Sequence, residues 1–294
     1  MDQFSLIGQL TVNGLLLAGV YALLALGLNV IFGVIRVLNM AHGEVLMMGA
    51  FAAFWVWQLA GLNPVFALLL LGPVFFGCGY LFQYFVVRRL DGSRMPIEDS
   101  SLILTYGLSL SLAALARVLW SADYKAVPLL QGSWMVGELL VSRSRTAAFA
   151  TAVAITAGMF ALLHRTDIGM AIRATAQSKD LAAACGVRAR HVHAVAFGIG
   201  ATMAAAAGMM LATMYAVYPD MGLEYSIRAF VIIILGGLGS MPGAFVGALM
   251  LGLIESFGSY VVGTLAATLI PFVVIVIVLL LRPAGLLGAR GRTG

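Results

Sequence analysis

The sequence contains few charged residues and few of the motifs that soluble enzymes use. Asp, Glu, Lys and Arg make up 10% of its 294 residues, against about 25% in a soluble domain. Its two cysteines, Cys78 and Cys185, are far apart and have no CxxC spacing, which indicates neither a disulfide nor a zinc site. No GxSxG nucleophile motif and no GxxxxGK(S/T) phosphate loop occurs. These absences argue against a soluble globular fold, a serine hydrolase and a subunit that itself hydrolyses nucleotides.

Long apolar runs are the main feature of the chain. Hydrophobic residues make up 62% of it, and five stretches contain no charged residue: 3–35, 45–87, 146–164, 230–254 and 256–281. Because one helical crossing of a bilayer takes about 20 apolar residues, the sequence predicts an all-α, polytopic integral membrane protein. It is expected to form one transmembrane domain, 1–294, with about 8–9 transmembrane helices in the lipid bilayer.

The predicted spans and the basic residues together suggest an orientation. Spans are predicted over 6–35, 45–61, 64–87, 100–119, 146–163, 191–217, a glycine-broken pair at 227–240 and 243–261, and 264–281. Three loops, 88–94, 164–190 and 282–294, hold eleven of the seventeen Lys and Arg residues, which places them in the cytoplasm. We therefore attribute the net charge of +5 to these loops and expect no nucleic-acid partner. The N-terminus and a loop over 120–145 then lie outside, with Arg143 and Arg145 as exceptions to the rule.

The stretch NMAHGE places three polar residues, Asn39, His42 and Glu44, between two charge-free runs. His42 and Glu44 are two metal-ligand types, but no third ligand lies nearby, so no metal site is predicted. Asn39 is a suitable N-cap for a helix that begins near Met40, and Glu44 suits the positive end of its dipole. A helix start within a membrane can also meet an anionic substrate group, so capping and a transport role are compatible.

A second unusual stretch is ILGGLGSMPGAFVGALMLGLIES, residues 234–256. Four glycines and a proline between 236 and 243 do not continue a helix. Non-helical backbone at membrane depth is tolerated only where it is buried in protein or lines a cavity. A short loop between two spans and a discontinuous helix beside a pathway both fit, and the pair could be re-entrant. Glu255 follows near mid-bilayer, where an acid marks either a functional site or a structural hydrogen bond.

The basic loop over 165–190 contains the pattern of a short helix. Ser178 is a typical N-cap, Asp180 falls in the first turn, and Gly186 follows three alanines as a stop signal. A short helix of small residues between two spans can fit into a groove of a soluble partner. A solvated connector is the alternative.

Three stretches resemble the permease subunits of branched-chain amino acid ABC importers. They are NGLLLAGVYALLALGLNVIFGVIRVLNMAHGEVLMMGA, GMAIRATAQSKDLAAACGV and LGGLGSMPGAFVGALMLGLIES. NMAHGE and GGLGSMPGA are the specific pieces, and the similarity covers nearly the whole chain. The resemblance implies a multi-pass bacterial inner-membrane subunit paired with a second permease subunit as a heterodimer. Two cytoplasmic ATPase subunits and an extracytoplasmic substrate-binding protein complete the importer; the partners use ATP, and this chain binds no cofactor.

Within such an importer the candidate residues have two roles. The translocation pathway or its gate is assigned to Asn39, His42, Glu44, Gly236, Gly237, Gly239, Ser240 and Glu255. Coupling to the ATPase is assigned to Arg173, Ser178, Lys179, Asp180, Ala183 and Gly186. No catalytic and no metal-binding residue is predicted.

Other functions stay open. Urea and short-amide permeases carry a similar NMAHGE, so the substrate is less firmly indicated than the type of transporter. An ion-coupled secondary transporter would use Glu44 and Glu255, and an intramembrane enzyme would turn over substrate alone. Neither explains the capped helix in the cytoplasmic loop.

Overall fold

The protein is a helical bundle with one short β-hairpin among the described residues. The computed structural model describes residues 3–92, 95–128, 130, 132–282 and 285–287. Within them, seven helices are long and apolar enough to cross a membrane: α1 (Gln3–Ile35), α2 (His42–Ala60), α3 (Pro64–Phe85, continued by the 3-10 helix η1, Val87–Gly92), α4 (Ile97–Trp120), α5 (Arg143–Arg165), α8 (Ala189–Leu211) and α10 (Met241–Val262). The remaining elements are α6 (Asp167–Gln177), α7 (Lys179–Ala184), α9 (Met221–Gly236), α11 (Thr264–Ala267), α12 (Ile270–Leu281), β1 (Ser133–Val136) and β2 (Leu139–Ser142).

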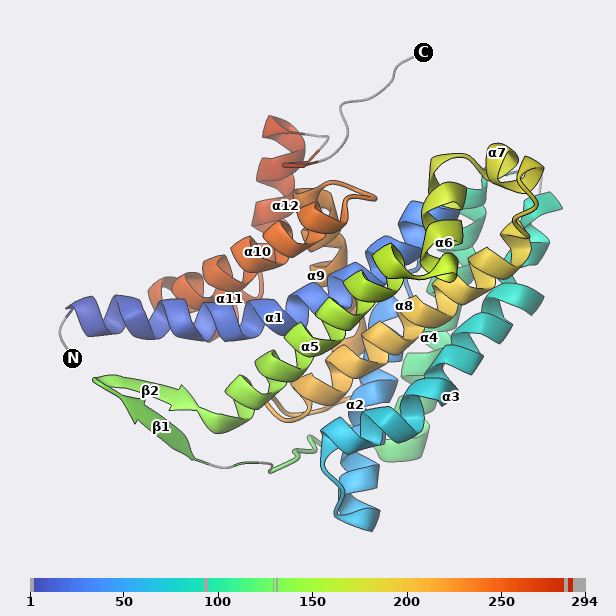
Figure 1. Ribbon diagram of the computed structural model, residues 1–294. Coiled ribbons are helices and arrows are strands. Elements are labelled where there is room, and N and C mark those ends of the chain that lie inside the picture. Colours follow the sequence, from blue (N-terminus) through green and yellow to red (C-terminus); the bar gives the residue numbers. More distant parts are fainter. Residues whose placement is uncertain (1–2, 93–94, 129, 131, 283–284, 288–294) are drawn as a thin grey trace.

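The predicted fold class is confirmed. The chain is a multi-pass helical membrane protein, and α12 is a further, shorter apolar helix. The bundle has two different ends: the N-terminus and the β-hairpin lie at the left of Figure 1, whereas α6 and α7 lie together at the upper right. We call them the hairpin end and the α7 end. The positive-inside rule predicts that the α7 end is cytoplasmic.

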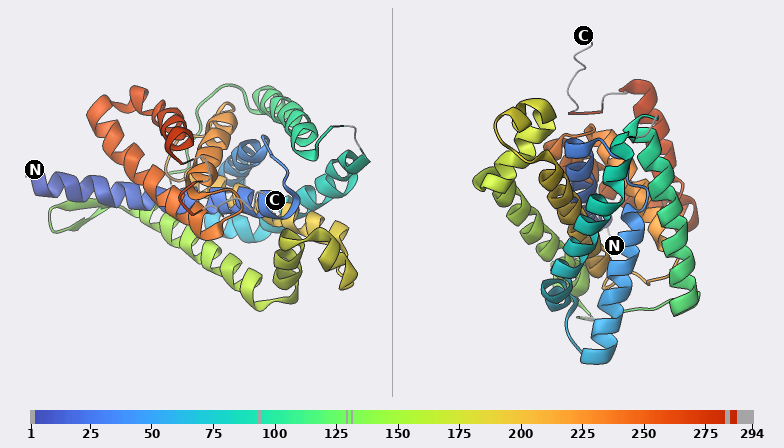
Figure 2. Two further views of the ribbon diagram at one scale, coloured as in Figure 1. Left: turned by 90° about the horizontal axis from the view of Figure 1, so that it is seen from above. Right: turned by 90° about the vertical axis from the view of Figure 1, so that its right-hand side faces the viewer.

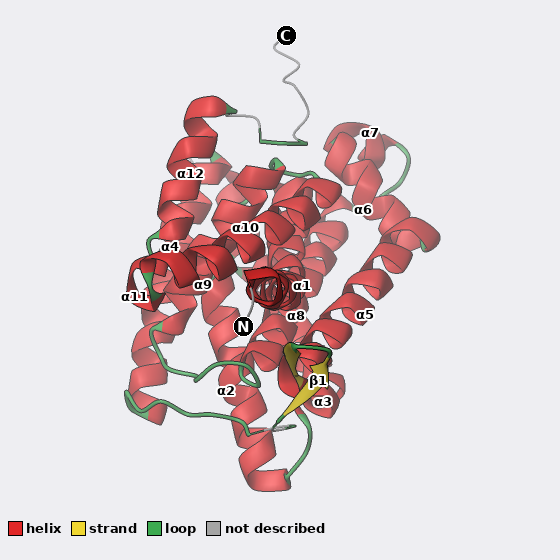
Figure 3. Cartoon of the chain, turned by 90° about the vertical axis from the view of Figure 1, so that its left-hand side faces the viewer, coloured by secondary structure: helices red, strands yellow, loops and turns green. Residues whose placement is uncertain are grey.

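Helix α1 lies at the centre of the bundle. Figure 3 looks along it and shows α5, α8, α9 and α10 around it, and Figure 2 shows it passing through the molecule. No proline interrupts its 33 residues, which extend about 50 Å at 1.5 Å per residue. It ends where Arg36 takes a left-handed backbone conformation, with φ 57°. One helix therefore carries side chains to both ends of the bundle.

Small residues let α8 pack closely against α1 and α2. A side chain at Gly200 would meet the carbonyl oxygen of Gly27 and the side chain of Ile31. A side chain at Gly208 would overlap the carbonyl oxygen of Leu46. Helices in membranes associate through such close backbone contact, because lipid tails provide little hydrophobic drive.

The glycine-rich break is present between α9 and α10. Gly237 and Gly239 have φ values of 106° and 81°, which side chains disfavour. Ser240 caps α10 by accepting a hydrogen bond from the Gly243 N–H at 3.2 Å. Two helices therefore meet at a non-helical turn, as predicted.

The predicted last span over 264–281 is wrong as one continuous helix. α11 ends at Ala267 and α12 begins at Ile270, with Pro271 in the first turn of α12. Proline lacks an N–H and clashes with the preceding turn, so it begins a helix and does not continue one.

The connecting segments contain more structure than predicted. The 120–145 loop contains the antiparallel β1–β2 hairpin, and Gln9 of α1 holds it by exchanging two 2.9 Å hydrogen bonds with the backbone of Leu140. The 165–190 loop contains the unpredicted helix α6, which Thr166 caps by accepting a hydrogen bond from the Gly169 N–H. Of the predicted basic loops, Arg94, Arg290 and Arg292 lie outside the described residues.

Candidate functional site

A cavity of about 470 Å³ opens at the hairpin end, between α1, α5, α9 and α10. It contains Glu255 of α10, one of the predicted pathway residues, which is 8% exposed. The Tyr21 hydroxyl donates a 2.5 Å hydrogen bond to Glu255 Oε2, and Arg228 Nε donates a 3.0 Å hydrogen bond to Oε1. The buried acid is therefore held by two helices at once.

Arg228 joins Glu255 to a second carboxylate. Its Nη1 donates a 2.7 Å hydrogen bond to Glu224 Oε1, and its guanidinium lies over the ring of Tyr225. Tyr218 donates a hydrogen bond to the other oxygen of Glu224. Burial, and then this hydrogen bond, raise the pKa of the Tyr218 phenol, so it stays a neutral donor at neutral pH. The cavity thus contains a connected network of charges with satisfied hydrogen bonds.

The NMAHGE stretch lies deep in the bundle. Asn39, His42 and Glu44 are at most 3% exposed. The His42 Nε2 lies 3.0 Å from the carbonyl oxygen of Leu24 in α1, which requires Nε2 to carry the proton and donate. Glu44 Oε1 accepts a 3.1 Å hydrogen bond from the Ser109 hydroxyl of α4.

The capping prediction for Asn39 is wrong in register. Helix α2 begins at His42, its N-cap position is Ala41, and no side chain caps it. Asn39 Oδ1 instead accepts a 3.2 Å hydrogen bond from the Ala41 N–H, two residues on. Asparagine often makes this local turn contact, which competes with helix formation. Glu44 lies in the first turn of α2, as predicted.

The glycine-rich break lies at the α7 end, away from the Glu255 cavity. Gly239 N–H donates a 2.8 Å hydrogen bond to Asn29 Oδ1 of α1. A second cavity, of about 830 Å³, is lined by Asn29, Gly239 and Ser240 together with Arg36 and Arg173. Gly236 and Gly237 are buried, whereas Leu238 and Gly239 are exposed and line this cavity. Irregular backbone that lines a cavity is tolerated at membrane depth.

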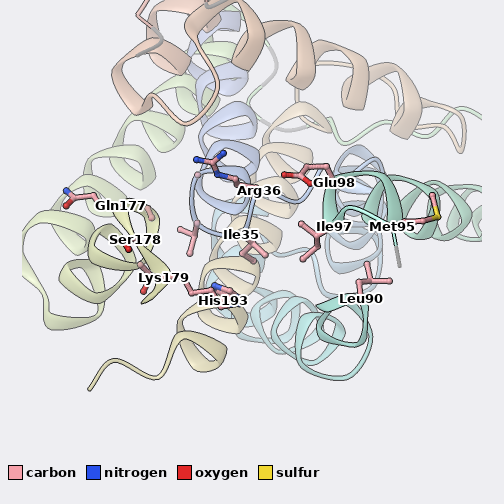
Figure 4. Close-up of a pocket in the computed structure, with 14 residues that line it drawn as sticks. Ile35, Arg36, Leu90, Met95, Ile97, Glu98, Gln177, Ser178, Lys179 and His193 are labelled. Atoms are coloured by element: carbon pink, nitrogen blue, oxygen red, sulfur yellow. The ribbon is translucent and has the colours of Figure 1, made fainter. Parts of the chain in front are cut away.

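A third cavity, of about 420 Å³, lies beside the start of α7. Figure 4 shows Arg36 and Glu98 along one rim of this pocket, with Lys179 and His193 across from them. Its lining comes from the end of α1, the start of α4, the α6–α7 junction and α8. The start of α7 therefore faces, across this cavity, the ends of three long helices, α1, α4 and α8.

The predicted short helix is confirmed as α7. Ser178 Oγ accepts a 3.3 Å hydrogen bond from the Leu181 N–H, and Gly186 follows the helix with φ 85°. Ala183 is exposed, whereas Ala182 packs inward. Leu181 is 71% exposed, and α7 is not one of the helices long enough to cross a membrane. Leu181 is thus a large exposed apolar side chain on the short connection between α6 and α8.

The comparisons with known proteins agree with this architecture. Residues 10–279 match the family described as "Branched-chain amino acid transport system / permease component". The chain belongs to this permease family. Its similarity to the family, noted from three stretches of sequence, thus extends over nearly its full length.

Individual relatives cover almost the entire permease. It is 33% identical to the high-affinity branched-chain amino acid transport system permease protein BraD of Pseudomonas aeruginosa, over 95% of each chain. It is 32% identical to the corresponding protein LivH of Escherichia coli K12, over 98% of this chain and 97% of LivH. The probable branched-chain amino acid transport permease protein LivH of Methanocaldococcus jannaschii is 25% identical, over 94% and 91%. No solved structure matches the permease.

The predicted site residues of the permease lie in separate places. Asn39, His42 and Glu44 form a buried centre at the start of α2. The glycine-rich break comes directly before α10, and Glu255 lies in the second half of that helix. α9 separates the first group from Glu255. The Ser226 hydroxyl of α9 accepts a hydrogen bond from the Gly43 N–H and donates one to the Met40 carbonyl oxygen. Arg228 of the same helix lines the Glu255 cavity.

Of the predicted coupling residues, only Arg173 lies away from α7. Ser178, Lys179, Asp180, Ala183 and Gly186 lie on or next to α7. Arg173 belongs to α6 and lines the 830 Å³ cavity, with its Nη1 buried and without a partner among the described residues.

Sequence reasoning missed Tyr21, Glu224 and Arg228. The spacing along the chain was a signal for Arg228. Arg228 precedes Ser240 by 12 residues, and Glu255 follows Ser240 by 15 residues. Two antiparallel helices joined at the turn near Ser240 place residues at similar distances before and after the turn at similar depths in the membrane. Within the described residues, no group of three or more His, Cys, Asp or Glu could hold a metal ion.

Proposed function

We propose that the permease is the membrane subunit of an ATP-binding cassette importer and forms the translocation pathway for branched-chain amino acids. The observation that carries the ATP-driven part is α7, a capped short helix with an exposed leucine at the end predicted to be cytoplasmic. The substrate is supported by family membership and by the names of the relatives, which favour branched-chain amino acids over urea or short amides.

The importer requires several partners. A second permease subunit completes the membrane part, two cytoplasmic ATPase subunits bind and hydrolyse ATP, and a binding protein delivers substrate outside the bacterial inner membrane. In this arrangement α7 docks on an ATPase through Leu181, Ala183 and neighbouring residues. The pathway uses the hairpin-end cavity with Glu255, the buried centre at Asn39, His42 and Glu44, and the break at Gly236, Gly237, Gly239 and Ser240.

A substitution at Leu181 tests the proposal. Leu181→Asp removes an apolar contact and places a charge at the docking surface, so it should abolish ATP-dependent uptake, while the protein still inserts and accumulates in the membrane. Radiolabelled leucine uptake into right-side-out vesicles, with ATP enclosed and the binding protein added outside, measures this. Leu62→Asp is the matched control, because Leu62 is also exposed, at 42%, on the turn between α2 and α3, and it should transport normally.

The same assay distinguishes the transporter types. ATP-driven uptake should persist when ionophores collapse the ion gradients. Uptake that requires an ion gradient and ignores ATP, or normal transport by Leu181→Asp, would contradict the ABC-importer assignment.

A further inference from the structure

We propose that the hairpin-end cavity binds the transported molecule itself, as the zwitterion of an aliphatic α-amino acid. Arg145 binds the carboxylate, and Glu224 and Glu255 face the ammonium group. This inference rests on the proposed function, since it identifies what the pathway recognises within the membrane subunit.

The charges of the cavity match a zwitterion. Two cations, Arg145 and Arg228, and two carboxylates, Glu224 and Glu255, line the same space. Their formal charges cancel, as those of a zwitterion do, yet the two signs are held at different points. Arg228 pairs with both carboxylates, so these three groups together keep a net charge of −1, and Arg145 carries the opposite charge at another point of the lining. A zwitterion can match both, whereas a ligand with only one charged group matches one of them.

Arg145 is the cation available to a ligand. Arg228 is committed to both carboxylates by its salt bridges. Among the described residues, no carboxylate forms a salt bridge with Arg145, whose guanidinium lies over the ring of Tyr215 at 5.5 Å. A guanidinium presents a planar fork of N–H donors that fits a carboxylate with two parallel hydrogen bonds. Stacking on Tyr215 holds that fork in place beside the cavity.

The rest of the lining suits an ammonium group and an aliphatic side chain. Tyr215, Tyr218 and Tyr225 line the cavity. Arg145 and Arg228 lie over the rings of Tyr215 and Tyr225, so Tyr218 is the ring offered to an ammonium group, since aromatic rings attract cations through their faces. Leu10 and Leu17 of α1 provide apolar surface on another side. The volume of about 470 Å³ falls in the range of about 300–1,000 Å³ that small-molecule sites have.

Direct binding tests the proposal without a binding protein. The permease is purified from membranes with the subunits that remain bound to it, and binding of radiolabelled L-leucine is measured in lipid nanodiscs. L-Leucinamide lacks the carboxylate and 4-methylpentanoate lacks the ammonium group. Each should compete at least roughly tenfold more weakly than unlabelled leucine, the value of one charge-assisted hydrogen bond.

Arg145 and Arg143 form a matched pair on the same helix. Arg145→Gln should weaken leucine binding roughly tenfold and leave leucinamide binding unchanged, because only the carboxylate contact is lost. Arg145→Lys keeps the charge without the fork and should retain part of the preference for leucine over leucinamide. Arg143→Gln should behave as the wild type, since Arg143 is exposed and lies over Trp134 at 5.7 Å.

Two results would overturn the proposal. One is a wild-type permease that binds no leucine although its ATP-dependent uptake is intact. The other is an Arg145→Gln variant that still prefers leucine to leucinamide as the wild type does. If ATP-dependent uptake is absent while leucine binding still depends on Arg145, the binding site is supported and the proposed function fails.

Discussion

Arg228 lies between two carboxylates in the interior of the bundle, and because it is buried its charge must be paired there. It is 9% exposed, and its partners Glu224 and Glu255 come from its own helix and from α10. Removing one partner of a buried ion pair leaves an uncompensated charge, which costs more than the pair contributes. The network therefore stabilises the bundle only while it is complete.

Substitutions at Arg228 and Glu255 should differ accordingly. Arg228→Met strands two carboxylates and should lower the free energy of unfolding by about 3–5 kcal/mol. Glu255→Gln keeps a hydrogen-bonding group beside Tyr21 and Arg228 and should cost less. Thermal unfolding in detergent, followed by intrinsic fluorescence, measures both. Equal melting temperatures for the two variants would show that burial of unpaired charge does not dominate here.

Among the elements, α7 was predictable because its signals are local. Ser178 and Gly186 mark its two ends within nine residues of sequence. The hairpin and the pairing of Arg228 with Glu255 depend on contacts with distant residues: Gln9 holds Leu140 across 131 positions. The break at Gly236–Gly243 could be located from composition, but which end of the bundle it faces depends on its contact with Asn29. Composition thus predicted the spans, apart from the division of the last one, and capping residues predicted the short helix. Tertiary contacts decided how the site residues group.

A glycine pair tests how far α7 depends on its stop signal. Gly186 has φ 85°, and a side chain there is strained although no atom lies within 4 Å. Gly186→Ala should destabilise the end of α7 by about 1 kcal/mol and speed amide hydrogen exchange over residues 179–187. Gly158→Ala, in open space inside α5, should leave exchange in α7 unchanged. Unaltered exchange in Gly186→Ala would indicate that other contacts hold the helix.

The orientation of the complete bundle can be tested with its own cysteines. Both Cys78 and Cys185 are exposed and free, so a Cys78→Ser background leaves Cys185 as the single thiol. A membrane-impermeant maleimide should label Cys185 in inside-out vesicles and not in intact cells. Leu62→Cys, made in a Cys78→Ser, Cys185→Ser background, should show the reverse pattern. Labelling of Cys185 from outside intact cells would show that the topology is the reverse of the proposed one. α7 would then lie outside the cell, where it could not contact a cytoplasmic ATPase.

The central position of α1 has a consequence for how the permease is made. Chains leave the ribosome N-terminus first, so α1 enters the bilayer before any of the helices that enclose it. One 18-residue stretch of α1 has a mean hydropathy of 2.3, the highest among the seven spans, yet 83% of that stretch is buried in protein. α1 must therefore be compatible with two environments in turn, first lipid and later protein. Gly27 and Ile31 contact Gly200 of α8, so these contacts form only after α8 has been synthesised. Until then newly made α1 is surrounded by lipid, which the second half of the chain later displaces.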